Sequence, residues 1–509
     1  MLNVAFRVDA SLHIGSGHVM RCLVLADTLR SNGYKVVFYT RPQEGDLIRL
    51  IKSRGYLVCE LKQPVVWLEP KSTADYMAWL QVDEIDDAQD FVEHVSSIDL
   101  VIVDHYGISS EWHKVIRKKY SCKIIAIDDL VRKHDADLII DQTLLRKSSE
   151  YKKSNPSAKV LSGTQYAIIG SDFEKQHLIE LQSKKNIEMT PKVLLSMGGV
   201  DRPNATLKVL EAFRNKYAHP PLFTVLLSSR APHYKLIKRF AERNKTWVTH
   251  IDFVENMADL MSLHDVAIGA PGSTSWERAC LGLPSIIMPL ADNQTEICER
   301  LNAAGASISI ELNSVTEKII KSYKQMMQNY KKMKSINLML CDGVGAARIV
   351  ENIKELSEKP FILRYANEGD IQQVYSWQCA PETRRYSLNK STPSYIEHEK
   401  WMLGKLKSKD NYFYIIETNN SDRKSLGVIR LDCISSKEYL VSIYVSPDHF
   451  GKGIAKFALK ELDLIHADFV INAVVLKANL ASHALFSRAG YKKTSEESYV
   501  RQPIKVEKK

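Results

Sequence analysis

The sequence lacks the features of several large protein classes. None of its 509 residues belongs to a run approaching the ~18 consecutive apolar residues that a membrane-spanning helix needs. Residues 1–9 contain Arg7 and Asp9 and have no apolar segment of signal-peptide length. We therefore expect a cytoplasmic protein with no membrane partner.

The chain also has little that would suit a metal site or a disulfide framework. Its eight cysteines form no C-x-x-C pair and lie mostly in apolar segments. They are expected to be small core residues in a reducing compartment, so no metal is predicted. A hydrophobic content of 45% and a charged content of 26% are ordinary for a globular chain, and this length predicts two or three domains.

The charge pattern does not favour a nucleic-acid partner. The formal net charge is +10, yet basic residues are interleaved with acidic ones, as in residues 41–54. Solvated helix faces explain this pattern, and a mild positive bias also suits small polyanionic substrates. The sequence predicts no particular oligomer.

A short glycine loop follows the first predicted strand. Residues 4–9 are strand-like and 19–29 have helical periodicity, with Gly15, Gly17 and His18 between them. The loop is too short for a dinucleotide fingerprint and has no Walker lysine. A histidine at a helix N-terminus is favoured in its neutral form, so His18 is a candidate proton acceptor. The alternative is that it only caps the helix.

Strand and helix segments then alternate, which predicts parallel sheets with helices on both faces. We expect two Rossmann-like domains, residues 1–155 and 156–357, that face each other across a cleft. Polar residues that follow strands would share one rim of the first sheet; they are Asp104 to Gly107, Asp128, Asp129, Asp141 and Gln142.

A second glycine turn follows the strand-like residues 265–268. Residues 269–277 read GAPGSTSWE and open a helix. Gly272 allows close approach of a ligand, and the first helical turn at Ser273 and Thr274 offers free N–H groups, as a diphosphate requires. The alternative is a T-x-x-E capping box between Thr274 and Glu277 that has no ligand.

Together these motifs resemble known families. Residues 253–294 are similar to the donor half of GT-B glycosyltransferases such as the peptidoglycan GlcNAc transferase. The segments 7–11, 15–23, 128–130, 196–201 and 270–278 resemble, in order, the nucleotide-sugar hydrolase of pseudaminic acid biosynthesis, which removes UDP from UDP-2,4-diacetamido-2,4,6-trideoxy-β-L-altropyranose. One departure is Thr143, where asparagine is expected.

The resemblance implies a ligand and a set of site residues. UDP on a sugar would place uracil at Phe253 and Val254, the phosphates at Ser273 and Thr274, and the ribose at Glu277. Catalysis would use His18, with Asp9 and Asp128 holding the sugar. The other implied substrate-binding residues are Arg7, Gly15, Gly17, Gly198, Gly199, Asp201, Asn204, Gly272, Asn293 and Gln294.

A third domain is expected from residue 358, because Pro360 ends the preceding helix. Residues 446–455, SPDHFGKGIA, follow an antiparallel series and resemble the coenzyme A pyrophosphate loop of the GNAT superfamily of N-acetyltransferases. The resemblance implies acetyl-CoA as co-substrate and an α+β fold. The implied acetyl-CoA-binding residues are Val445, His449, Gly451, Lys452, Gly453, Ile454, Ala455, Asn479, Ser482 and Phe486.

Phe486 departs from this family, because it stands where the general-acid tyrosine is expected. Ser482 or water would then protonate the thiolate, or no acid would be needed. Trp377, Pro381, Arg384, His398 and Trp401 resemble the subgroup that acetylates the 4-amine of UDP-amino-sugars, although both tryptophans would equally suit a core.

The predicted function is therefore bifunctional: acetylation of a UDP-amino-sugar, followed by inverting hydrolysis that removes UDP. Two alternatives stay open. One is a UDP-sugar glycosyltransferase with a protein N-acetyltransferase domain, and the other is a nucleotide-sugar-binding regulator without turnover.

Overall fold

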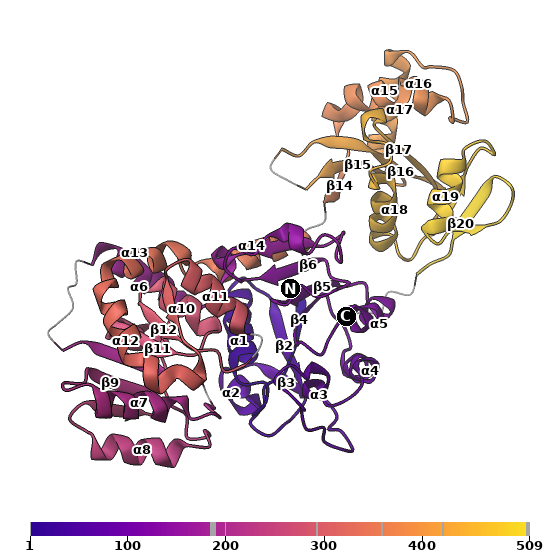
Figure 1. Ribbon diagram of the computed structural model, residues 1–509. Coiled ribbons are helices and arrows are strands. Elements are labelled where there is room, and N and C mark those ends of the chain that lie inside the picture. Colours follow the sequence, from indigo (N-terminus) through magenta and orange to yellow (C-terminus); the bar gives the residue numbers. More distant parts are fainter. Residues whose placement is uncertain are drawn as a thin grey trace. The chain divides into compact units, whose positions relative to one another are not determined.

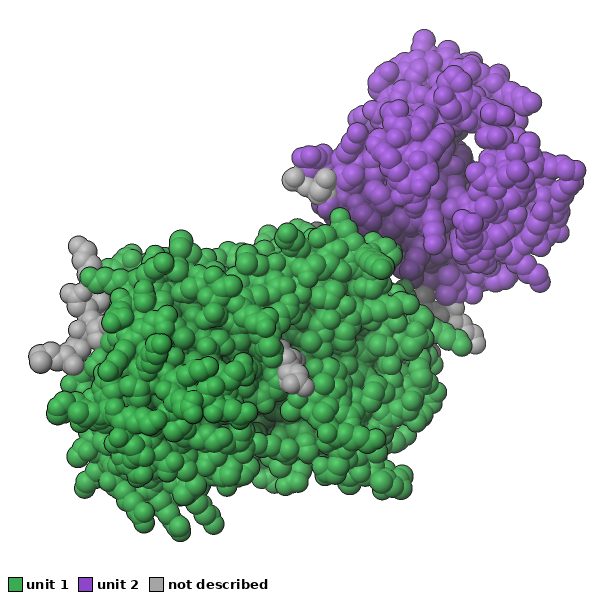
Figure 2. Space-filling model, viewed as in Figure 1, with its two compact units in different colours: residues 1–357 green, residues 358–509 purple. Residues whose placement is uncertain are grey.

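The chain forms two compact units, residues Met1–Ser357 and Glu358–Lys509 (Figure 2). The computed structural model describes residues 2–183, 190–198, 200–291, 294–357, 360–419 and 422–504. In those ranges no helix combines the length and the apolar character that crossing a membrane requires.

Unit 1 begins with a seven-stranded parallel sheet (Figure 1). The strand order is β3-β2-β1-β4-β5-β6-β7, so the direction of winding reverses between β1 and β4. Loops that follow these two strands meet at the carboxyl edge of the sheet, where open α/β sheets bind ligands. The strands are β1 (Asn3–Val8), β2 (Lys35–Thr40), β3 (Leu57–Glu60), β4 (Leu100–Asp104), β5 (Lys123–Ile127), β6 (Leu138–Asp141) and β7 (Lys159–Ser162).

Helices cover this sheet, and buried aliphatic residues on both of its faces form two cores. The helices are α1 (Gly17–Ser31), α2 (Ile48–Ser53), α3 (Tyr76–Leu80), α4 (Glu84–His94) and α5 (Ser110–Lys119).

The second sheet of unit 1 is also parallel, with six strands in the order β10-β9-β8-β11-β12-β13. Its reversal lies between β8 and β11, so the loops that follow these strands also meet at one edge. The strands are β8 (Lys192–Ser196), β9 (Leu222–Leu226), β10 (Val248–Ile251), β11 (Val266–Gly269), β12 (Ser285–Ile287) and β13 (Ser307–Ser309). The helices are α6 (Ser171–Gln182), α7 (Ala205–Lys216), α8 (Tyr234–Arg243), α9 (Met257–Ser262), α10 (Ser273–Cys280), α11 (Thr295–Ala303), α12 (Val315–Gln328), α13 (Tyr330–Leu340) and α14 (Gly345–Ser357).

The boundary between the two halves of unit 1 differs from the one expected at residues 155 and 156. Strand β7 pairs with β6 and so completes the first sheet. Helix α14 also returns to that half, because Ile349, Val350 and Ile353 lie in the core beneath β1 and α1. The apolar stripe of α14 is buried there, which ties the end of unit 1 to its beginning.

Unit 2 is built on a mixed sheet in the order β14-β15-β16-β17-β18-β20-β19. Strands β17 and β18 run parallel and pair only from Glu438 and Val470 to Leu440 and Asn472. Beyond this point β17 continues to Val445 along β16, while β18 turns to β20, so the sheet opens between them.

Unit 2 contains the strands β14 (Phe361–Tyr365), β15 (Tyr412–Thr418), β16 (Ser425–Ser435), β17 (Glu438–Val445), β18 (Val470–Val474), β19 (Lys492–Lys493) and β20 (Ser498–Arg501). Its helices are α15 (Ile371–Cys379), α16 (Pro381–Arg384), α17 (Tyr395–Lys407), α18 (Ile454–Ile465) and α19 (Leu480–Arg488). Together they give the α+β fold that the sequence predicts.

Candidate active sites

His18 lies in the first turn of α1 and contacts the end of β4. Its Nδ1 is 2.6 Å from Oδ1 of Asp104. A carboxylate only accepts, so Nδ1 carries the hydrogen and a neutral imidazole presents Nε2 as an acceptor. Nε2 has no hydrogen bond to any described residue, and the side chain is 11% exposed. This arrangement suits a proton acceptor better than a helix cap.

Arg21 binds the carboxylate of Asp104, the group that contacts His18. Its Nε and Nη2 each donate to Asp104 at 2.6 Å. Burial raises the pKa of Asp104, but Arg21 and His18 together outweigh this effect and hold the pKa well below its usual range. Asp104 therefore stays ionised and can stabilise an imidazolium that forms on His18.

Tyr106 and Asp129 complete the surroundings of His18. The ring of Tyr106 meets the imidazole edge-on with centroids 4.8 Å apart. Its hydroxyl donates to Oδ1 of Asp129 at 2.6 Å. The loops after β1, β4 and β5 thus bring together residues that are distant in the sequence.

Asp9 directly follows β1, but the structure does not support the sugar contact predicted for it. It is fully buried, and its two oxygens accept hydrogen bonds from Arg7, Thr40 and the backbone N–H of Arg41. Arg7 is equally buried and also binds Asp87, so it has no contact to offer a ligand. These two predicted site residues form part of the supporting framework instead.

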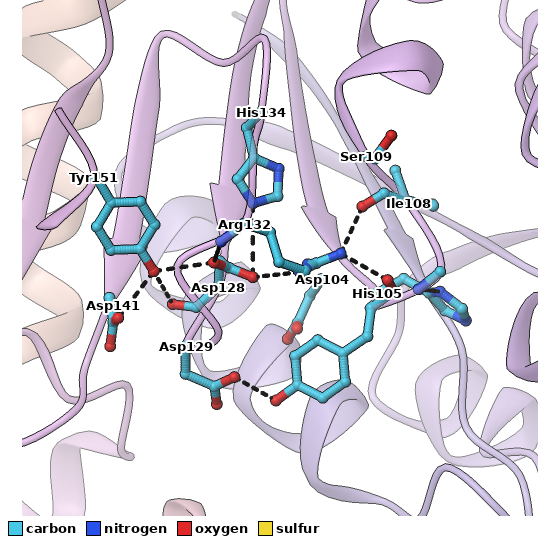
Figure 3. A network of polar contacts seen from close by, with 12 residues as sticks. Asp104, His105, Ile108, Ser109, Asp128, Asp129, Arg132, His134, Asp141 and Tyr151 are labelled. Carbon is cyan, nitrogen blue, oxygen red and sulfur yellow. Dashed lines mark hydrogen bonds and ion pairs between the residues drawn. The ribbon is translucent and has the colours of Figure 1, made fainter. Parts of the chain in front are cut away.

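Asp128 is saturated in a similar way (Figure 3). Its carboxylate accepts from the backbone N–H and Nε of Arg132 and from the hydroxyl of Tyr151, while Nε2 of His134 lies 3.6 Å away. The residue is 1% exposed. Asp128 therefore fixes the loop after β5, and the sugar contact predicted for it is not supported.

The predicted rim also joins the two halves of unit 1. Asp141 accepts from the backbone N–H of Thr143 and from Nε of Arg146, whose Nη2 reaches Glu296 on α11 at 2.9 Å. The asparagine expected at Thr143 is replaced by a buried residue whose backbone supplies the contact to Asp141.

The second glycine turn has the geometry of an anion cradle. Gly272 adopts a φ of +140°, and a Cβ built there would meet nothing within 4 Å. It is the N-cap of α10, with no side-chain cap, so the T-x-x-E capping box is not formed. Among the described residues no side chain accepts from the N–H groups of Ser273 and Thr274, so this first turn is open to an anion.

Glu277 lies one turn further along α10 with its Oε2 buried and unpartnered among the described residues. Burial raises the pKa of Glu277 to about 7, against the opposing effect of Arg278. A buried carboxylate without a donor costs free energy, which hydroxyl groups of a ligand would recover.

The remaining predicted residues of unit 1 follow strands of both sheets. Gly15 and Gly198 have positive φ and open space at Cβ, while Gly17 has open space only. Asp201 caps α7 through the N–H groups of Ala205 and Thr206, and Oδ1 of Asn204 has no partner among the described residues. Phe253 is 74% exposed. Val254 is half-buried and Gln294 accepts from the N–H of Leu290, whereas Gly199 and Asn293 lie outside the described residues.

In unit 2 the predicted pyrophosphate loop lies at the end of the splayed strand β17. Gly451 and Gly453 have φ of +77° and +76°, and Gly453 is the N-cap of α18. Both are exposed, as is Lys452 between them, and Ile454 is buried beneath the turn. Exposed N–H groups at a helix start next to an open strand edge suit a diphosphate carried by a long, thin cofactor.

The rest of the predicted acetyl-CoA set follows the same edge. Val445 ends β17 and His449 lies in the turn after it, with an unpartnered Nδ1 among the described residues. Ala455 is half-buried in the first turn of α18, and Asn479 caps α19 by accepting from the N–H of Ser482. Phe486 is 4% exposed and packs against Tyr491 and Tyr499 as a core residue.

The predicted acceptor residues lie on the other face of this sheet. Trp377 and Trp401 belong to the core that α15 and α17 form against β15 and β16. His398 is 1% exposed, and Arg384 on α16, three residues after Pro381, donates to the backbone oxygen of Asn389. The rings of both tryptophans therefore pack in the core, as the alternative interpretation of these residues predicts.

Sequence reasoning missed the closest partners of His18. The sequence predicts Asp104, Tyr106 and Asp129 only as members of the polar rim, and Arg21 only as part of the segment 15–23 that carries the resemblance. Their spacing along the chain gives no signal, because they meet only where the sheet reverses direction. Arg21, three residues after His18 on the same helix, was the one partner that helical periodicity could have indicated.

The fold and these sites define an α/β unit with two Rossmann-like parallel sheets, followed by an α+β unit with a mixed sheet. The Glycosyltransferase family 28 C-terminal domain matches residues 206–353, and the Acetyltransferase (GNAT) domain matches residues 361–492. The predicted combination of a nucleotide-sugar hydrolase relative and a GNAT domain in one chain is thereby confirmed.

The chain is also similar to individual proteins. The UDP-2,4-diacetamido-2,4,6-trideoxy-beta-L-altropyranose hydrolase of Campylobacter jejuni is 28% identical over 262 residues, which are 51% of this chain and 82% of that one. An uncharacterized protein of Methanocaldococcus jannaschii is 24% identical over 97% of this chain and 98% of its own. Among solved structures, MurG of Acinetobacter baumannii covers 70% of this chain and 100% of its own with 15% identity and a TM-score of 0.48.

Proposed function

We propose that unit 1 hydrolyses UDP-2,4-diacetamido-2,4,6-trideoxy-β-L-altropyranose and that unit 2 uses acetyl-CoA to acetylate the 4-amine of the UDP-amino-sugar that precedes it. The observation that carries the first activity is the contact between His18 and Asp104, which leaves Nε2 of His18 free as an acceptor. The homology to the Campylobacter jejuni hydrolase supports the substrate class.

In the proposed hydrolysis, water attacks the anomeric carbon. Nε2 of His18 takes a proton from the water as the new carbon–oxygen bond forms, and Asp104 stabilises the imidazolium. The bond to the diphosphate breaks with the electron pair on UDP, whose charge the start of α10 at Ser273 would bind. A diphosphate leaves without protonation, so one base is enough and the sugar is released with inverted configuration.

In the proposed acetyl transfer, acetyl-CoA lies between the splayed strands β17 and β18. The exposed turn at Gly451 and Gly453 binds its pyrophosphate, and the free edge of β17 binds the pantetheine arm. The amine attacks the acetyl carbon, and the carbon–sulfur bond breaks with its electron pair on the CoA sulfur. Since Phe486 has no hydroxyl and is packed in the core, the proton that the nitrogen loses reaches the thiolate through Ser482 or water, or the thiolate leaves without an acid.

The main competing function for unit 1 is sugar transfer to an acceptor other than water, because the same fold serves both reactions. The saturation of Asp9 and Asp128 removes two carboxylates that could have activated an acceptor hydroxyl, and His18 alone would then have that role. A non-catalytic regulator would need neither an open Nε2 nor a CoA loop.

One experiment separates these functions. Full-length protein is incubated with UDP-2,4-diacetamido-2,4,6-trideoxy-β-L-altropyranose and no acceptor, and UDP and free sugar are quantified by mass spectrometry. Stoichiometric release of both supports hydrolysis, release only after addition of an acceptor would mean transfer, and binding without release would mean regulation. Unit 2 is tested in parallel by measuring the CoA formed from acetyl-CoA. The acceptor in this assay is either the corresponding 4-amino sugar or a peptide.

A further inference from the structure

Asp129 differs from the other carboxylates around His18 because one of its oxygens is left open. Both oxygens of Asp104 accept from Arg21, and both oxygens of Asp9 and Asp128 also accept hydrogen bonds. Oδ1 of Asp129 accepts from Tyr106, but Oδ2 accepts from no described residue. Its nearest cation is Nη1 of Arg21 at 4.0 Å, beyond hydrogen-bonding distance.

The position of Asp129 makes this open oxygen relevant to catalysis. Tyr106 donates to Asp129 and packs its ring edge against His18, so the carboxylate lies one side chain away from the imidazole. Figure 3 shows Asp129 pointing away from the saturated Asp128, with a single contact drawn to it. Its side chain is 15% exposed, whereas those of Asp104, Asp128 and Asp9 are closed off.

The physical chemistry of such a group favours a ligand that donates a hydrogen bond. Burial raises the pKa of Asp129, against the opposing effects of Arg21 and of the hydrogen bond from Tyr106. A hydroxyl or amide N–H would supply the missing donor. The diphosphate carries no donor, and the ribose and uracil are expected at Glu277 and Phe253, so the donor comes from the sugar.

We propose that Asp129 is a sugar-binding residue that accepts a hydrogen bond from a hydroxyl or acetamido N–H of the UDP-sugar beside the anomeric carbon. This inference rests on the proposed function of unit 1, but only on its substrate and not on its turnover. It moves the sugar contact from Asp128 to the adjacent residue.

The test compares ligands that differ only in the sugar. In a His18→Ala background, which slows turnover, calorimetry measures the affinity for UDP and for the UDP-diacetamido sugar. Asp129→Asn should weaken binding of the UDP-sugar by about tenfold or more and leave UDP unchanged, because the asparagine must serve Tyr106 with its oxygen and present its NH2 to the sugar donor. Equal affinity for the UDP-sugar, or an equal loss for both ligands, would overturn the proposal.

Two controls separate sugar binding from support of the fold. Asp135→Asn changes a surface carboxylate, 41% exposed, and should alter neither affinity. Tyr106→Phe removes the donor to Asp129 and should weaken UDP-sugar binding less than Asp129→Asn does. If both variants weaken it equally and the double variant no further, Asp129 acts only by holding Tyr106 and the proposal fails. Absence of UDP release by the wild type would reject hydrolysis while leaving this binding result intact.

Discussion

Nδ1 of His18 and Oδ1 of Asp104 are 2.6 Å apart, a contact that joins the first turn of α1 to the end of β4. Because β1 and β4 are neighbours at the reversal of the sheet, the histidine of the first loop and the carboxylate of another meet at the edge that binds ligands in such folds. The contact fixes the tautomer of His18 and leaves Nε2 available.

Replacing either member of this pair should abolish most hydrolysis, with different effects on stability. His18→Ala should lower the rate of UDP release by about a hundredfold, a common scale for loss of a general base. Asp104→Asn should also reduce the free energy of unfolding by about 3 kcal/mol, because it leaves Arg21 buried without its partner. Denaturant titration and rate measurement together distinguish them, and acetyl transfer should persist in both. Near-normal UDP release by His18→Ala would remove it from the mechanism.

The bond that breaks can be identified with oxygen-18 water. Attack at the anomeric carbon places the label in the sugar, and NMR of the first product should show inverted configuration because one displacement occurs. Label in UDP would indicate attack at phosphorus.

The affinity for the UDP-sugar should depend on the ionisation of Glu277. Burial raises the pKa of Glu277 to about 7, so in the free protein it is protonated over much of the window above its usual value of 4.5. If ribose hydroxyls donate to it, binding favours the ionised form and affinity should rise from about pH 6 to about pH 8. The phosphates of the UDP-sugar do not titrate there, so calorimetry reads the protein group. As the control, the affinity of Glu277→Gln for the UDP-sugar should not change with pH. If it rises with pH as steeply as in the wild type, Glu277 is not the group that titrates.

The same shift predicts a stability change in the protein without ligand. Between the unfolded pKa near 4.5 and the folded pKa of about 7, the folded state holds a proton that the unfolded state has released. Stability from this residue therefore falls as the pH rises through that window, and Glu277→Gln should remove the fall.

The glycine turn of unit 2 should be intolerant of side chains. Gly453 has a φ of +76°, a conformation that costs an L-residue about 1–2 kcal/mol. The backbone N–H groups of the turn that contains Gly453 are proposed to bind the pyrophosphate. Gly453→Ala should raise the KM for acetyl-CoA about tenfold while hydrolysis is unchanged. Gly404→Ala, in helix α17 with open space at Cβ, is the matched control and should stabilise by about 0.5–1 kcal/mol. Equal kinetics for both variants would exclude the turn from binding.

The two reactions should occur in a fixed order, with acetylation first. Both units are proposed to recognise a UDP-sugar, and loss of UDP would remove the binding energy that positions the amine for unit 2. A protonated amine would also have to be desolvated in a site for a neutral amide. Full-length protein given UDP-amino-sugar should therefore release UDP much faster when acetyl-CoA is present. Rapid release without acetyl-CoA would contradict this order.

Much of the architecture follows from local sequence. Alternating strand and helix patterns predict parallel sheets, and Pro360 marks the start of the segment that becomes unit 2. The glycines at 272, 451 and 453 identify turns because only glycine adopts their backbone conformation readily. The identity of Phe486 alone excludes a hydroxyl acid at that position.

Only the tertiary structure decided which carboxylates are available. Asp128 and Asp129 are adjacent in the sequence, yet one is saturated by Arg132 and Tyr151 while the other keeps an open oxygen near His18. The hydrophobic pattern of α14 likewise does not indicate that this helix packs into the core of the first sheet. The hydrogen bonding of the carboxylates and the packing of α14 both depend on partners that are distant along the chain. An acidic residue or an apolar stripe indicates that a partner is needed, but the local sequence does not indicate which one.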